Sequence, residues 1–240
     1  MSAILGFGIL TLWVPYRWPL SVFQVALFAF AAARIAKGRL PGLRLPGVLL
    51  AGAAAWGALQ VILGWTVDRV TTLDATLNWI TSLTAFALAA DLYRNVALRE
   101  RVLRAGVIFT VLLAVIAIFT YLTSPVGKAF WIFETGSESR TLGPFVYQNQ
   151  YAAFIEAILP VAIIAATRDR RHWVLHALIV ATLFGSVVTG GSRTGSILCL
   201  AEILLVPAIA FWRGMISRAI LARALLGCMG AVAVLTGVVG

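Results

Sequence analysis

Charged residues are scarce in this chain. Only 12% of its 240 residues are Asp, Glu, Lys or Arg, whereas soluble globular proteins carry about 25%. Hydrophobic residues make up 61% of the sequence, and the mean hydropathy is +0.97. These values exclude an ordinary soluble domain. They predict a polytopic membrane protein, since each helix that crosses a bilayer needs roughly 20 apolar residues.

The signatures of cofactor and metal enzymes are also missing. There is no Walker loop, no HExxH motif, no dinucleotide-binding glycine motif and no hydrolase elbow. The chain has two histidines and two cysteines. Both cysteines, Cys199 and Cys228, fall inside predicted spans, where a thiol usually behaves as a small apolar group. We therefore expect neither a cofactor nor a bound metal.

Nine apolar runs bounded by charges, Pro or Gly predict an all-α bundle of about nine membrane spans. The first run is short, and we expect it to form half of a helical hairpin closed at the turn from Pro15 to Pro19. It lacks the positive region and cleavage site of a signal peptide. No stretch between runs could hold a soluble domain, so we predict one integral membrane domain, residues 1–240. The runs are 2–15, 19–35, 47–65, 75–92, 105–122, 149–167, 173–188, 194–212 and about 219–239.

The distribution of basic residues predicts the orientation. The net charge of +10 does not indicate nucleic-acid binding, because these residues are spread over loops between apolar runs. Five lie in one set of alternate loops: Arg17, Arg69, Lys128, Arg140 and Arg193. The other set is strongly basic and is therefore predicted to be cytoplasmic, with the N-terminus in the cytoplasm and the C-terminus outside. Its members are Arg34, Lys37, Arg39, Arg44, Arg94, Arg99, Arg101, Arg104, Arg168, Arg170, Arg171, Arg213, Arg218 and Arg223.

Aromatic residues at the predicted span ends agree with this orientation, because Trp and Tyr gather at membrane interfaces. The orientation also puts two polar segments, one from Arg140 to Asn149 and one around Arg193, on the same outer side. The aromatic residues concerned are Trp13, Tyr16, Trp18 and Trp65 at outer ends, and Trp173 and Trp212 at inner ends.

The turn Gly190-Gly191-Ser192-Arg193 has the composition of an anion site. Two glycines leave backbone N–H groups open, Thr194 opens a helix, and Arg193 is the only charge in the turn. Free N–H groups, a positive helix end and a guanidinium together suit a phosphate. The alternative is an arginine that only anchors a helix end among lipid headgroups.

The segment from Arg140 to Asn149 is the most polar stretch between two apolar runs. After the Gly143-Pro144 turn, Tyr147 and Asn149 offer donors and acceptors that suit sugar hydroxyls. The alternative is structural: the Gly-Pro pair ends the loop, and Asn149 caps the next helix.

Glu156 lies seven residues after Asn149, on the same helix face. A carboxylate at that depth is costly unless it is paired or faces a wet cavity, which makes Glu156 a candidate for substrate binding. It could instead be protonated or bonded to a neighbouring helix. Glu202, nearer the midplane of the run 194–212, has the same two interpretations. Pro160 is expected to kink the helix that carries Glu156 and to free a backbone carbonyl.

Two stretches carry a family resemblance: GPFVYQNQYAAFIEAILP and, one span later, TGGSRTGSILCLAEILL. Over roughly residues 140–212 the chain resembles the O-antigen ligase and polymerase family of bacterial envelope glycosyltransferases. The resemblance implies a multi-pass protein of the bacterial inner membrane, similar to the membrane part of GT-C-like glycosyltransferases. The donor would be a glycan on undecaprenyl diphosphate, and the acceptor lipid A core, another glycan or protein, at the periplasmic face. No nucleotide sugar, metal or nucleic acid would be used.

By this resemblance, Arg193 would hold the donor diphosphate, and Arg140 and Asn149 would line the outer cavity. Ser192, beside Arg193, is a further candidate for substrate binding. The family's asparagine-rich signature is Tyr-Gln-Asn-Gln here. The family continues into a large periplasmic loop with a catalytic histidine, which would lie beyond Gly240, so we expect the chain to be the N-terminal part of an enzyme.

Two other functions stay open at this stage. The chain could be a transporter or flippase for a lipid-linked or anionic sugar, with Glu156 and Glu202 along the pathway. We find no internal repeat of the kind that many transporters show. It could also be an inactive fragment that only binds partners and membrane lipids.

Overall fold

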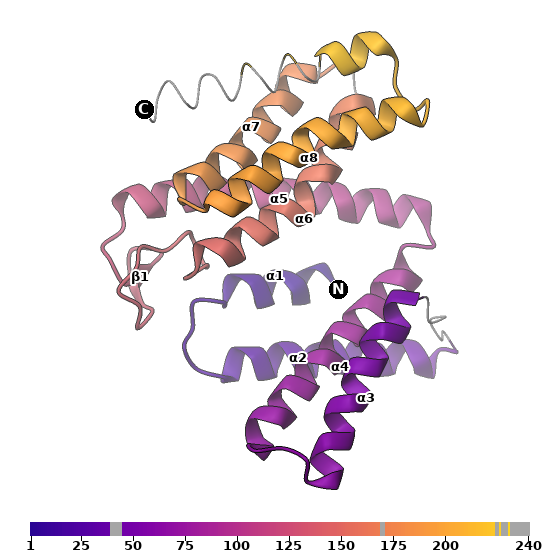
Figure 1. Ribbon diagram of the computed structural model, residues 1–240, viewed down its shortest axis with the longest axis vertical. Coiled ribbons are helices and arrows are strands. Elements are labelled where there is room, and N and C mark those ends of the chain that lie inside the picture. The colour runs from indigo at the N-terminus through magenta and orange to yellow at the C-terminus, as the bar shows by residue number, and fades with distance from the viewer. Residues whose placement is uncertain (39–44, 169–170, 224–225, 227–229, 231–240) are drawn as a thin grey trace. The chain divides into compact units, whose positions relative to one another are not determined.

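The computed structural model (Figure 1) describes residues 1–38, 45–168, 171–223, 226 and 230. Cys228, most of the ninth apolar run, and Arg39, Arg44 and Arg170 lie outside the described residues. The described residues form helices and one small hairpin. In chain order the elements are α1 Ser2–Leu10, α2 Trp18–Ala36, α3 Leu45–Leu63, α4 Arg69–Leu92, α5 Val96–Thr123, β1 Lys128–Ala129, β2 Phe133–Glu134, α6 Gln148–Arg168, α7 Trp173–Thr189 and α8 Arg193–Trp212.

Five of these helices, α2, α3, α5, α6 and α8, are long and apolar enough to cross a membrane. The chain is therefore a membrane protein with an all-helical fold. The prediction of about nine spans goes further than the described residues support. The run 2–15 contains a helix of only 9 residues, which spans about 14 Å of a bilayer core about 30 Å thick. α7 has 17 residues, and α4 is long but carries several polar side chains, so neither is among the five.

The chain divides into two compact units. Unit 1 comprises Met1–Thr11 and Tyr16–Val102, and unit 2 comprises Leu12–Pro15 and Leu103–Gly240. Each unit has contacts of its own and is described separately. The single domain inferred from the sequence stays a prediction.

In unit 1, polar contacts align α2 and α4 as parallel neighbours. Arg17, at the start of α2, forms an ion pair with Asp74 in α4. Arg34, near the end of α2, forms one with Asp91, near the end of α4, and Gln24 Nε2 donates to Asn78 Oδ1 at 3.2 Å between them. Both ion pairs join residues 57 positions apart, so the two helices run in the same direction.

The start of α4 is fixed by Asp68, the residue that precedes it. The Asp68 carboxylate accepts hydrogen bonds from the backbone N–H groups of Val70 and Thr71 and from the Thr71 hydroxyl. These hydrogen bonds, of which the one from the Thr71 hydroxyl has the largest effect, hold the pKa of Asp68 below its usual value. This N-cap explains why α4 begins six residues before the predicted run 75–92.

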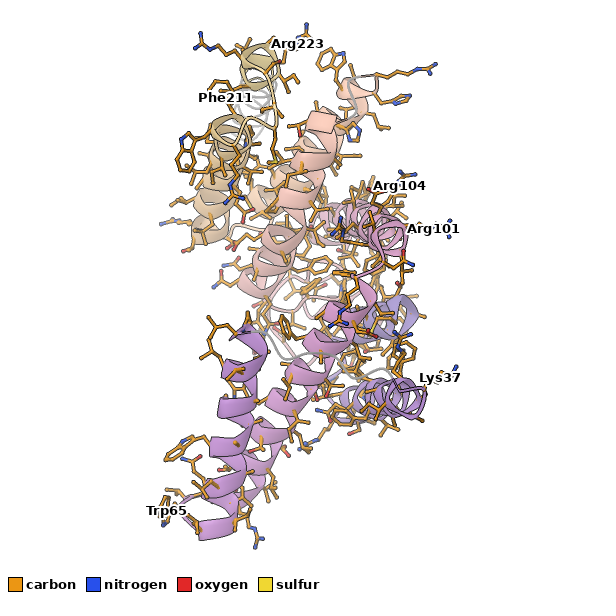
Figure 2. The ribbon with its side chains drawn as sticks, turned by 90° about the vertical axis from the view of Figure 1, so that its right-hand side faces the viewer. Lys37, Trp65, Arg101, Arg104, Phe211 and Arg223 are labelled. Carbon is orange, nitrogen blue, oxygen red and sulfur yellow. The ribbon has the colours of Figure 1, made fainter. Side chains whose placement is uncertain are left out.

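Some basic side chains at or near helix ends extend away from the backbone. Figure 2 shows this for Lys37, which follows α2, and for Arg101 and Arg104 on the first half of α5. All three are exposed. Trp65, in the loop between α3 and α4, is also exposed (Figure 2).

In unit 2, α6 packs against both α7 and α8 (Figure 1). The buried side chains at these contacts are apolar and closely spaced along each helix, which gives the unit a continuous core. They include Tyr151, Ile155 and Leu159 of α6, Leu183 and Val187 of α7, and Cys199 and Ile203 of α8. The connection from α5 to α6 contains the β1–β2 hairpin.

Candidate functional site

The two polar segments singled out in the sequence meet at one end of unit 2. Ser192 Oγ donates to Asn149 Oδ1 at 3.0 Å, which joins the first turns of α6 and α8. Beside this bond, a Cβ placed on Gly190 would lie 2.7 Å from Leu142 Cδ1, and one on Gly191 would lie 3.5 Å from Gln148 Oε1. Residues 142–149 therefore lie directly against residues 190–192.

The turn before α8 has a backbone conformation that favours glycine at position 191. α7 ends at Thr189, and Gly191 has φ +75°, a conformation that is costly for residues with a Cβ. Ser192 is buried and is the N-cap of α8, where its Oγ accepts from the Gly195 N–H at 3.3 Å. The Ser192 hydroxyl thus connects two helices by donating to one and accepting from the other.

Arg193 is the first residue of α8, and its side chain is exposed. Within residues 1–38, 45–168 and 171–223, no hydrogen-bond or ion-pair partner of its guanidinium is found. A cation at a helix N-terminus is unfavourable, because that end of the helix is already positive. A bound anion would relieve this repulsion while accepting hydrogen bonds from the guanidinium.

Arg140 has a structural role that the sequence did not predict. Its Nη1 donates to the carbonyl oxygens of Tyr121 at 2.8 Å and Leu122 at 3.4 Å, in the last turn of α5. Basic side chains stabilise helix C-termini in this way. The Arg140 side chain is exposed, so Nη2 and Nε remain available for a ligand.

The Gly143-Pro144 turn is a buried support for the polar segment. Leu142 and Phe145 pair across it through two backbone hydrogen bonds of 2.9 and 3.1 Å, and both side chains are buried. The Gly143 N–H donates to Thr120 Oγ1 of α5 at 2.8 Å. This anchoring fixes where α6 begins and leaves Tyr147 exposed next to it.

Asn149 does not cap α6, because the helix begins at Gln148, one residue earlier. Its side-chain oxygen accepts from Ser192, while the Asn149 side chain as a whole is exposed. The Nδ2 donors of Asn149 therefore stay available beside Arg193. This is the part of the predicted site that the fold brings together most closely.

Glu156 lies deeper between the same two helices. Two turns of helix, about 10 Å, separate it from Asn149. Glu156 of α6 lies within electrostatic reach of both Cys199 and Glu202 of α8. One carboxylate oxygen of Glu202 is buried, and no hydrogen-bond partner for it is found among the described residues. Pro160 is accommodated inside α6 without ending it, and it leaves the Glu156 carbonyl without its usual helical donor.

Gly195 was not recognised from the sequence, although it permits the contact between α6 and α8. A Cβ on Gly195 would overlap the Cβ of Ala152 and lie 2.9 Å from Ser192 Oγ. Ala152 and Gly195 are separated by the same 43 positions as Asn149 and Ser192, so the helices run parallel in this register. Small residues at helical spacing, here Ser192, Gly195 and Cys199, were the available signal.

We expect Gly195→Ala to lower the free energy of unfolding by about 1–3 kcal/mol, because the added methyl forces apart two backbones in a well-packed core. Titration of the protein with SDS in mixed micelles measures this change. Gly106→Ala is the matched control, since a Cβ on this α5 glycine meets nothing within 4 Å. The double variant Ala152→Gly/Gly195→Ala should recover part of the loss. Equal stability of Gly195→Ala and Gly106→Ala would contradict the close packing.

The geometry of this end of unit 2 suits an anion that carries hydroxyl groups. It offers an exposed guanidinium at a helix N-terminus, amide donors from Asn149, and the nearby phenol of Tyr147. Among the described residues, no group of three or more His, Cys, Asp or Glu side chains could hold a metal ion. Comparison of the chain with protein-family models, curated proteins and solved structures finds no match.

Proposed function

We propose that the chain is part of a bacterial envelope glycosyltransferase of the O-antigen ligase or polymerase type. Its donor would be a glycan on undecaprenyl diphosphate, and its acceptor lipid A core, another glycan or protein. One observation carries the proposal: the Ser192–Asn149 hydrogen bond joins the Arg193 turn to the Tyr147–Asn149 segment. A phosphate-binding group and sugar-binding groups would then face one substrate.

The proposal includes a location and a topology. We place the chain in the bacterial inner membrane as a multi-pass protein of about nine spans, with a cytoplasmic N-terminus and a GT-C-like arrangement. Besides the five apolar helices, α1, α4, α7 and the run 219–239 would complete the nine. The positive-inside distribution of basic residues supports this orientation, which puts Arg193 and Asn149 at the periplasmic face.

In the proposed reaction, a hydroxyl oxygen of the acceptor attacks the sugar carbon that is bonded to the diphosphate. The new C–O bond forms as the bond to the diphosphate oxygen breaks, and undecaprenyl diphosphate leaves with the electron pair. The Arg193 guanidinium and the positive end of α8 would stabilise the charge that develops on this leaving group. The acceptor's proton passes to a general base, which by the family resemblance would be a histidine.

Binding of undecaprenyl diphosphate in detergent micelles tests this proposal. We expect Arg193→Ala to weaken binding about tenfold, since a hydrogen bond to a charged group contributes about 1.5 kcal/mol and 1.4 kcal/mol is a factor of ten. Arg193→Lys should lose less, because it keeps the charge without the two-donor geometry. Arg213→Ala, at the opposite end of α8, is the control and should bind normally. Unchanged binding by Arg193→Ala would refute the proposed role.

A transporter or flippase for a lipid-linked or anionic sugar is the second candidate. It is favoured by the two carboxylates, Glu156 and Glu202, that lie within electrostatic reach of one another in two helices able to span a membrane. Transfer of labelled substrate across proteoliposomes, with no covalent product, would favour this function over glycosyl transfer.

A further inference from the structure

The hairpin between α5 and α6 exposes apolar side chains at its tip. Lys128 pairs with Glu134 and Ala129 with Phe133, which leaves Phe130, Trp131 and Ile132 to form the connection. Ile132 is 72% exposed and Trp131 42% exposed. An aqueous loop would gain nothing from presenting these side chains to water.

The backbone at the tip is held in an unfavourable conformation. Phe130 has φ +48° and Trp131 has φ +65°, and they are the only residues other than glycine with positive φ in the described part of the chain. Bulky residues rarely adopt this region, and they do so where their surroundings enforce it. The tip of the hairpin thus combines an unfavourable backbone conformation with exposed apolar side chains.

Two contacts fix the aromatic rings of the hairpin. Trp131 Nε1 donates to Thr123 Oγ1, at the last residue of α5, at 2.8 Å. Trp13, in the Leu12–Pro15 segment of unit 2, stacks on Phe133 with ring centroids 4.6 Å apart. The Trp131 indole is thus held beside the end of a helix, with its polar N–H satisfied.

The exposed apolar surface of α5 leads to this point. α5 is the most apolar of the five helices able to span a membrane. Leu112, Ile116 and Phe119 are exposed on it at helical spacing, and the same face reaches Thr123, the partner of Trp131. Lipid that covers this face of α5 would meet the hairpin at the end of the helix.

We propose that the hairpin Lys128–Glu134 inserts its tip into the interfacial region of the bilayer, in the leaflet on the side of Arg140 and Arg193. Its partner is the boundary between the phospholipid headgroups and the acyl chains, where Trp is favoured because its ring is apolar and its N–H is polar. The charged ends of the hairpin, Lys128 and Glu134, stay among the headgroups. This inference depends on no particular substrate.

Insertion of the hairpin would also set the depth of the polar segment. Thr141 Oγ1 donates to the Lys128 carbonyl at 2.8 Å, and the Thr135 N–H donates to the Gly127 carbonyl at 2.9 Å. The first bond ties the base of the hairpin to Thr141, the residue that follows Arg140, and the second closes the base of the hairpin itself. A tip anchored in the interface would therefore keep Arg140 near the plane of the headgroup phosphates.

A fluorescent label at the tip tests the proposal. We would replace Cys199 and Cys228 with alanine, introduce Ile132→Cys, attach an environment-sensitive NBD label and reconstitute the protein in phosphatidylcholine vesicles. Glu138→Cys, an exposed polar position of the same loop, is the control. We expect NBD emission at position 132 to shift to shorter wavelength and to be quenched by nitroxide lipids, more strongly by a headgroup nitroxide than by one at the acyl terminus.

Each outcome decides the proposal. Stronger quenching by nitroxide lipids at position 132 than at 138, with weaker quenching by aqueous iodide at 132, supports insertion. Water-like emission at position 132 with iodide quenching equal to that at 138 overturns it. Shifted emission without nitroxide quenching also overturns it, because the tip would then be covered by protein.

Discussion

Replacing Tyr151 with alanine is expected to lower the free energy of unfolding by about 3 kcal/mol, the lower end of the range for deleting a large aromatic side chain. Tyr151 is fully buried, packs edge-to-face on Phe145 with ring centroids 5.4 Å apart, and its hydroxyl lies 2.6 Å from Ser186 Oγ. The lower end of the range applies because, in the unfolded state, the separated helices stay in the micelle and the Tyr151 ring stays out of water. The loss of stability therefore comes mostly from lost packing contacts.

Two variants separate the causes of this loss. Tyr151→Phe should cost only about 0.5–1.5 kcal/mol, the value of one hydrogen bond, because Ser186 Oγ keeps its bond to the Leu183 carbonyl. Tyr147→Ala, at a side chain that is 65% exposed, should leave stability nearly unchanged. SDS titration followed by tryptophan fluorescence measures all three. If Tyr151→Ala lost no more stability than Tyr147→Ala, the described packing of α6 on α7 would be wrong.

Arg34→Ala should destabilise the protein by about 1.5–3 kcal/mol, the value of a hydrogen bond between charged groups, because it removes the arginine from a mostly buried ion pair. The side chains of Arg34 and Asp91 are only 18% and 13% exposed. The related pair Arg17–Asp74 also joins α2 to α4 but is 45% and 38% exposed, so Arg17→Ala should cost no more than about 1 kcal/mol.

The combined variant Arg34→Leu/Asp91→Leu tests whether the penalty comes from the carboxylate that remains when Arg34 is removed. Two apolar side chains leave no charge from this ion pair between the helices, so stability should return toward that of the native protein. The same SDS titration gives the comparison. A double variant as unstable as Arg34→Ala would instead show that the remaining carboxylate is not the cause of the loss.

Much of the helical framework could be predicted from apolar runs. The run 149–167 corresponds to α6 Gln148–Arg168, and the run 194–212 to α8 Arg193–Trp212. The parallel directions of α6 and α8 also agree with the predicted alternation of loops. An apolar run shows which residues can contact lipid, but it does not show where a helix begins. α5 begins at Val96, before its predicted apolar run, because Asn95 Oδ1 accepts a hydrogen bond from the Leu98 N–H at the start of the helix.

The candidate site was predictable only in part. Loop alternation predicted that residues 140–149 and 190–193 lie on one side of the membrane, and in the structure residues of these two segments are in contact within unit 2. The contact of Arg140 with the end of α5 depends on the path of the intervening loop, which no short pattern determines. The bond between Tyr151 and Ser186 depends on how each helix is rotated about its axis, and apolar runs with weak periodicity leave that rotation undefined.

The parallel arrangement of α6 and α8 has a consequence for the electrostatics of the site. Aligned peptide dipoles give each helix about half a positive charge at its N-terminus, and the Ser192–Asn149 bond holds two such ends together. The backbone alone therefore contributes about one elementary charge at this location. No side-chain substitution removes that contribution and no change of pH titrates it, so a variant without Arg193 should retain a residual attraction for anions.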